Sequence, residues 1–350
     1  NGTDAESASS NYWNDTAPTS SVFTSGANNV NNTFIAYCWS EVSGFSKFGT
    51  YSGTGAVQTI TTGFKPRWIL LKRTDSVSNW RIVDALRGDN SFNAETNEAE
   101  SSWDFDITDT GFTLNETGNN SNASGGTYIY AAFGDRAGNN WTTNNLIATA
   151  GLETANQGFD VVNWTGNGST QSISSLAFQP DLVWIKEVGS TGDHHLFDSI
   201  RGATKALRSN VNDAEVTDTN ELTAFNSNGF SLGSGGDVNA SGTSTVAWCW
   251  RAGGTASSNS DGSITSSVSA NQTYGFSVVK NTYSGSYGLR SVGHGLGKTP
   301  SLVISKRTDS AGDWLVHTGV TGSYQMLTLN AQSAATAASS YFSADNSTFS

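Results

Sequence analysis

This chain of 350 residues contains little cysteine, proline or methionine, with two, four and one of each. The two cysteines, Cys38 and Cys249, occupy equivalent places in two repeated segments, so we expect buried thiols rather than a disulfide. Basic residues are outnumbered by acidic ones, 18 to 30, and form no cluster, which argues against nucleic-acid binding. No apolar run approaches the roughly 20 residues of a membrane helix, so we expect no membrane insertion.

What the chain does contain is repetition. Pro66, Pro180 and Pro300 open three versions of one phrase, which read KPRWILLKR, QPDLVWIKE and TPSLVISKR. An upstream phrase beginning Gly-Phe recurs in step, and so does a downstream phrase that reads NNTFIAYCW, SGGTYIYAAF and GTSTVAWCW. Repeats of this kind indicate one structural unit used several times.

The repeat spacing predicts the domain organisation. The predicted segments are 1–44 (rear part of a split repeat), 45–134 (complete repeat), 135–157 (linker), 158–251 (complete repeat), 252–273 (linker) and 274–350 (front part of a split repeat). The front part should lack its own closing strand. The two end pieces could close into a single domain only with a duplicated segment. We therefore expect either that the chain derives from a longer array or that a neighbouring chain's N-terminal segment supplies that strand.

The composition favours an all-β protein. Short β-branched and aromatic runs alternate with turns rich in Gly, Ser, Thr and Asn. We predict tandem, jelly-roll-like β-sandwich modules of about 90 residues, joined by polar linkers. Helical signals are weak and are confined to residues 203–210 and 331–340.

The sequence offers no repeated catalytic arrangement. His194 and His195 are adjacent, and neighbours in a strand point to opposite faces, so they would not chelate one ion. Asp84 with Arg87, and Asp198 with Arg201, form a matched pair that we interpret as a turn lock. We therefore predict a protein that is not an enzyme, with no catalytic residue, metal site or cofactor.

Aromatic residues beside predicted turns are the candidate ligand-binding groups. Trp80, His194 and Trp314 fall in the same column of the three repeats, and Trp103 and Trp141 also lie near loops. Aromatic faces among Asn, Asp and Thr suit stacking on sugar rings, whereas the alternative for each is packing in the core.

The phrases GFSVVKNTYSG, VGHGLGKTPSLVISKRTDSAGDW and NASGTSTVAWCW resemble a tandem module of unknown function. That module is common in tail, fibre and other virion proteins of bacteriophages, especially marine ones. The resemblance covers nearly all of 20–350 and implies a structural or adhesive component of the virion surface, such as a tail fibre, appendage or head-decorating protein.

The partners implied by that resemblance are copies of the chain itself and other virion proteins, with a host surface glycan as a further candidate. The alternative is an extracellular carbohydrate-binding adhesin that uses loop aromatics. A polysaccharide depolymerase is the weakest reading, because it needs two carboxylates in one cleft and the sequence offers no convincing pair.

Overall fold

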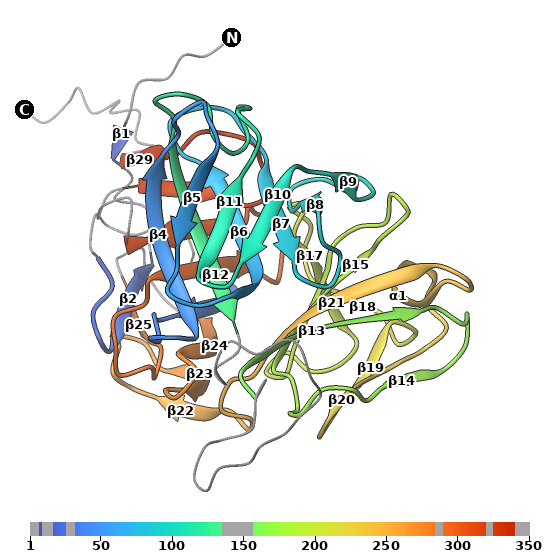
Figure 1. Cartoon of the computed structure of the whole chain (residues 1–350). Helices are drawn as coiled ribbons and strands as arrows, with labels where there is room; N and C mark the ends of the chain where they lie inside the picture. The colour runs from blue at the N-terminus through green and yellow to red at the C-terminus, as the bar shows by residue number, and fades with distance from the viewer. Residues whose placement is uncertain are drawn as a thin grey trace, which may run out of the picture.

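The structure is a computed structural model that describes residues 7–8, 17–25, 32–134, 157–283, 290–319 and 325–339. Almost all its regular structure is β-strand, and α1 (Gly236–Asn239) is the one helix among these residues. Within them, no helix has the length and hydropathy needed to cross a bilayer. The fold is therefore all-β and built from several modules, as the sequence predicts (Figure 1).

The first module is a six-stranded sheet, in the order β4-β12-β6-β7-β8-β9, faced by a three-stranded sheet, in the order β10-β11-β5. Its strands are β4 (Ser46–Ser52), β5 (Gln58–Thr61), β6 (Pro66–Arg73), β7 (Trp80–Asp84), β8 (Asn90–Asn93), β9 (Ser101–Ser102), β10 (Phe105–Thr108), β11 (Gly111–Leu114) and β12 (Thr127–Gly134).

The second module repeats this plan, with a large sheet in the order β13-β21-β15-β16-β17-β18 and a small one in the order β14-β20-β19. Its strands are β13 (Phe159–Thr165), β14 (Gln171–Ile173), β15 (Leu182–Glu187), β16 (His195–Asp198), β17 (Lys205–Arg208), β18 (Val216–Thr217), β19 (Leu222–Asn226), β20 (Gly229–Leu232) and β21 (Ser244–Trp250).

The third module combines both ends of the chain. Its large sheet runs β1-β29-β28-β27-β26-β3-β24-β23-β22, and β2 pairs with β25 in a separate small sheet. Its strands are β1 (Ser7–Ala8), β2 (Val22–Ser25), β3 (Thr33–Trp39), β22 (Ser257–Asn259), β23 (Ser266–Asn271), β24 (Phe276–Thr282), β25 (Arg290–Gly293), β26 (Leu302–Arg307), β27 (Leu315–Thr318), β28 (Gln325–Thr328) and β29 (Thr336–Ser339).

The expectation that a neighbouring chain completes the third module is wrong. The same chain's β3 lies between β24 and β26, with Trp39 paired to both Phe276 and Leu302. This position is the one that β12 and β21 hold in the other modules. The ladder on both sides of β3 satisfies backbone groups that would otherwise form two open strand edges.

The three large sheets share one core. In β3, β12 and β21, alternate residues face this core, and it includes Trp39, Phe133 and Trp250. The rings of these three residues contact one another in turn, with centroids 6.4 Å apart for Trp39 and Phe133, 5.9 Å for Trp39 and Trp250, and 5.8 Å for Phe133 and Trp250. Equivalent residues of the repeat thus meet at one point, which makes the chain a ring of three modules.

The opposite faces of the same strands pack against the small sheets. Cys38 and Cys249 lie there, in separate outer cores of the third and second modules, and both are free thiols as expected. Each module therefore has two buried layers, one shared at the centre and one of its own. This explains why the central strands are apolar at nearly every position rather than alternating.

Two local predictions fail. The helical signals at 203–210 and 331–340 lie in extended structure that includes β17 and β29, because pairing in the sheet overrides the helix propensity of their Ala, Leu and Lys residues. The predicted linker 252–273 contains β22 and β23, which pair with each other and with β24. The predicted linker 135–157 falls outside the described residues except for Gln157.

Candidate functional sites

The three candidate ligand-binding residues lie in the interior rather than at the surface. The exposed fractions of Trp80, His194 and Trp314 are 1%, 0% and 0%. Trp103 is also buried, at 2%, and Trp141 lies outside the described residues. A ring that is closed off from solvent cannot stack on a sugar, so the surface-stacking interpretation of these residues is corrected.

These buried rings instead join the modules. Each reaches a backbone carbonyl on the equivalent strand of a neighbouring module. The contacts are Trp80 Nε1 to Thr328 O at 2.9 Å, His194 Nε2 to Asn93 O at 3.1 Å, and Trp314 Nε1 to Arg208 O at 2.7 Å. Trp80 thus joins the first module to the third, Trp314 joins the third to the second, and His194 joins the second to the first. This cyclic order is what a closed ring requires.

A lysine lies opposite or beside each of these rings. Lys72, Lys186 and Lys306 are at most 1% exposed, and burial lowers the pKa of each to about 8. Their ammonium groups donate to backbone carbonyls, which include Gln332 and Asn212 of neighbouring modules for Lys72 and Lys306. The lysine that follows each repeated proline is therefore a structural hydrogen-bond donor at the junctions.

The matched Asp–Arg pairs do more than lock turns. The Asp84 carboxylate accepts the backbone N–H groups of Leu86 and Arg87, as a turn lock should, and it also binds the Arg87 guanidinium at 2.8 Å. In addition it accepts a hydrogen bond of 2.9 Å from the Trp248 indole of the second module. The turn prediction is confirmed, and the contact between modules is an addition that the sequence did not reveal.

The second junction repeats this arrangement with a phenol. Asp198 binds Arg201 and accepts a hydrogen bond of 2.9 Å from the Tyr37 hydroxyl of the third module. At the remaining junction the equivalent residues are Ala131 and Thr318, which line a cavity of about 10 Å³. That volume is close to the lower limit for one water molecule. The polar bridge is thus built at two of the three junctions.

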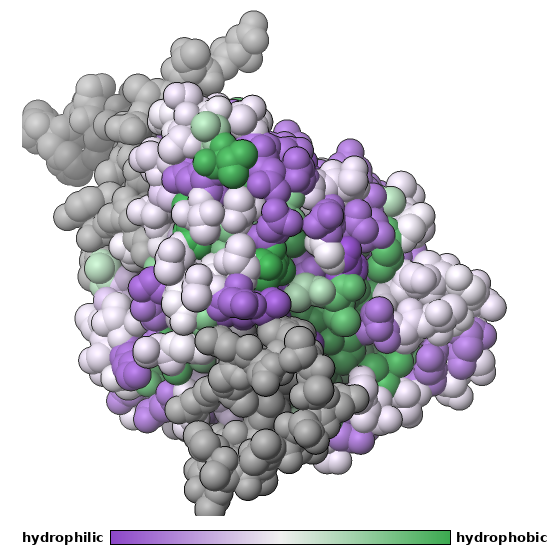
Figure 2. All heavy atoms as spheres, viewed as in Figure 1, coloured by the Kyte–Doolittle hydropathy of each residue, from purple (hydrophilic) through white to green (hydrophobic). Residues whose placement is uncertain are grey.

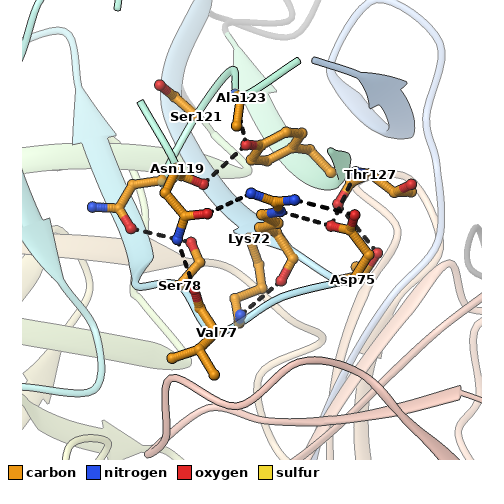
Figure 3. Close-up of polar contacts among 12 residues, drawn as sticks. Lys72, Asp75, Val77, Ser78, Asn119, Ser121, Ala123 and Thr127 are labelled. Atoms are coloured by element: carbon orange, nitrogen blue, oxygen red, sulfur yellow. Dashed lines mark hydrogen bonds and ion pairs between the residues drawn. The ribbon is translucent and has the colours of Figure 1, made fainter. Parts of the chain in front are cut away.

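The KRTDS turns illustrate how the outer ends of the modules are held. Arg73 binds Asp75 at 2.7 Å, and Asp75 in turn accepts the backbone N–H of Thr127 (Figure 3). Asn119 contacts the same guanidinium and donates to the carbonyl of Val77. These groups satisfy one another within a loop cluster, so the repeated aspartate is a turn element, as the sequence suggests.

A polar cavity of about 620 Å³ lies where the second module meets the third. Its lining includes Gln179, Asp181, Arg251, Asn271 and Gln272. Asp181 is committed to protein partners, because its carboxylate accepts hydrogen bonds of 2.7 Å from the Ser199 hydroxyl and the Ala252 backbone. The guanidinium and side-chain amides of the lining are groups that can bind the hydroxyls of a polar ligand.

A second polar cluster joins His195, Glu221 and Asp237, whose ligand-type atoms all lie within 4.8 Å of one another. His194 and His195 do point to opposite faces. The first packs with Trp184 and Trp248 in the shared core, and the second contacts Glu221 on the outer face of the sheet.

The family model described as a domain of unknown function, DUF7483, matches residues 1–137 and 154–350. The chain belongs to the DUF7483 family. No curated protein matches this DUF7483 chain, and no solved structure does.

Sequence reasoning on the DUF7483 chain missed the His195 cluster and the junction role of Asp84 and Asp198. Glu221 lies 26 residues from His195, immediately before β19 of the small sheet, so no local spacing links them. For the aspartates a signal did exist. Asp84 and Asp198 occupy one column of the repeat alignment, and the residues that donate hydrogen bonds to them, Trp248 and Tyr37, occupy a second column.

Proposed function

We propose that this chain is a non-enzymatic structural or adhesive protein of the bacteriophage virion surface, such as a tail fibre, an appendage or a head-decorating protein. The observation that carries this proposal is that the residues shared by the repeats are used for packing and for joining modules. The resemblance of the repeated phrases to virion modules supports the location at the virion surface.

The interior supports a rigid building block. The ring is closed by β3, which pairs with β24 and β26, and the three large sheets share one core. Such a ring resists separation of its modules better than a string of independent domains does. Figure 2 shows hydrophilic and intermediate residues over most of one face of the molecule, with an area of hydrophobic residues near its centre. The exposed large apolar side chains among the described residues are few, namely Val57, Val77, Leu86 and Val216. Such a surface suits polar contacts on an assembled particle.

The test is to locate the protein in an infected culture. Particles are purified on a density gradient, and the chain is detected by mass spectrometry and by antibody labelling in electron microscopy. We expect it to band with intact particles and to be labelled on their outside. Recovery only as a free protein in the lysate, with unlabelled particles, would contradict the proposal.

The polar cavity between the second and third modules favours a second candidate, a glycan-binding adhesin. Trp80, His194 and Trp314 are buried and cannot serve this role, but Arg251 and Gln272 can donate to sugar hydroxyls from the cavity wall. A glycan array probed with the wild type, Arg251→Ala and the exposed control Lys298→Ala tests it. Binding that is lost only in Arg251→Ala supports the adhesin, and binding to no glycan or equal binding by all three rejects this site.

A further inference from the structure

The His195 cluster brings three segments of the second module together. His195 begins β16 of the large sheet, Glu221 immediately precedes β19 of the small sheet, and Asp237 lies in α1. His195 and Glu221 are each 1% exposed, whereas Asp237 is exposed. The cluster therefore has a buried floor with one ligand at the solvent boundary, which leaves a path of entry for a small ion.

The buried groups of this cluster have few protein partners. His195 Nδ1 lies 3.1 Å from Glu221 Oε2, and His195 Nε2 is buried with no hydrogen-bond partner in the described part of the chain. A carboxylate removed from water requires a compensating positive charge, because leaving it unpaired costs several kcal/mol.

The first module shows what occupies the equivalent place there. Arg81 pairs with Asn93 on β8 at the ladder position where His195 pairs with Arg208 on β17. Burial lowers the pKa of Arg81, and nearby carboxylates, Glu116 first among them, oppose that effect. The first module thus places a permanent cation against its acidic groups, and the second module places a potential metal ligand against its own.

The spacing of two of the three donors suits a small divalent ion, and the third lies within 4.8 Å of both. Zinc binds imidazole nitrogen and carboxylate oxygen at about 2.0–2.2 Å, so two such ligands in a tetrahedral site lie roughly 3.3 Å apart. The observed separation of 3.1 Å between His195 Nδ1 and Glu221 Oε2 is close to this value. One nitrogen with two carboxylates leaves a fourth position for water. Imidazole favours zinc over magnesium or calcium, which prefer all-oxygen sites.

We propose that His195, Glu221 and Asp237 form a Zn²⁺ site that staples the two sheets of the second module. The ion would replace the charge that Arg81 provides in the first module, and it would tie β16 to the segment before β19 and to α1. Because the site lies apart from the module junctions, its role is to stabilise one module, and it is independent of where the protein assembles.

The test uses the full chain, stripped with a chelator and then titrated with ZnCl₂ in an isothermal calorimeter. We expect one Zn²⁺ per chain with micromolar or tighter affinity and a rise in the thermal midpoint. Asp237→Asn should weaken binding at least 10-fold, because it removes a charged ligand at an exposed position without disturbing the core. Asp213→Asn, an exposed aspartate of the same module, is the matched control and should bind as the wild type does.

Substitution with Co²⁺ provides a spectroscopic reading of the same site. The wild type should show the intense visible absorption of a tetrahedral site, and His195→Gln, if its far-ultraviolet circular dichroism is native, should not. Absence of binding at a hundredfold excess of ZnCl₂, or equal affinity in the wild type and Asp237→Asn, would overturn the proposal. In that case His195 and Glu221 form a simple hydrogen-bonded pair.

Discussion

The indole of Trp248 donates a hydrogen bond of 2.9 Å to the carboxylate of Asp84, although the two residues lie 164 positions apart in the chain. Trp248 belongs to the second module and Asp84 to the first, and Arg87 neutralises the same carboxylate. This contact joins two repeats through a charge that is fully buried. It is therefore the most sensitive place at which to test whether the modules unfold as one unit.

We predict that Asp84→Ala destabilises the whole chain by about 3–5 kcal/mol, because it removes the main carboxylate beside the buried Arg87 guanidinium, which keeps only its contact with Glu100, and leaves the Trp248 indole without its acceptor. Trp248→Phe should cost less, roughly 1–3 kcal/mol, since it leaves one acceptor unsatisfied and a small gap. Urea unfolding followed by tryptophan fluorescence measures both. Asp104→Ala, at an exposed site, is the control and should change stability by less than about 0.5 kcal/mol. A loss in Asp84→Ala as small as that of the control would show that the contact is unimportant.

Acid should destabilise the protein partly through His317. Burial lowers the pKa of this imidazole to about 4, below its value of about 6.5 in an unfolded chain. Between pH 6.5 and 4 the unfolded state binds the extra proton, so this contribution to stability is lost as the pH falls. Between pH 7 and 5, we expect the free energy of unfolding of His317→Gln to fall by roughly 2 kcal/mol less than that of the wild type. Parallel losses in the two proteins, measured by urea unfolding at each pH, would contradict this assignment.

The buried lysines predict a dependence of the same sign in the basic range. The pKa of Lys306 is lowered to about 8 in the folded chain, whereas an unfolded lysine titrates near 10.4. Between these values the unfolded state binds more protons, so the contribution of Lys306 to stability rises with pH. Comparing the wild type with Lys306→Met, we expect the wild type to gain up to about 3 kcal/mol relative to the variant from pH 8 to 10. The exposed control Lys298→Met should show no such change, and an equal pH dependence in all three would refute the prediction.

The repeats made the strands and module order readable from sequence, because each phrase specifies one strand and recurs in register. The interior of the ring was not readable. Trp80 follows a turn signal, yet it packs against Thr328 of another module, which no local pattern reveals. The fine register also varies: Phe133 pairs with Ser46 in the first module, whereas its counterpart Trp250 pairs with Phe159. A marker that repeats in sequence need not repeat in the ladder.

Polar composition misled the prediction in the segment that holds β22 and β23. Their serines and asparagines are typical of loops, but Ser266 pairs with Asn281 in the ladder between β23 and β24, and β22 forms the edge beyond it. Backbone hydrogen bonds in a ladder are available to any residue except proline, so pairing with an existing sheet can recruit a sequence of low β propensity. The His195 cluster was unreadable for a related reason, since its ligands converge only after the second module has folded.

The most direct test of the closed ring is a disulfide across the seam between β3 and β24. Thr33 and Thr282 are paired there, their hydroxyl oxygens lie 3.1 Å apart, and they are 249 residues apart in the chain. The variant with Thr33→Cys and Thr282→Cys is oxidised at micromolar concentration and separated on a non-reducing gel. Ser172→Cys with Ser231→Cys, a pair within the second module, is the positive control for a bond inside one chain. We predict a cross-linked monomer in both cases, and disulfide-linked dimers or larger species for the Thr33–Thr282 variant alone would contradict closure of the ring within one chain.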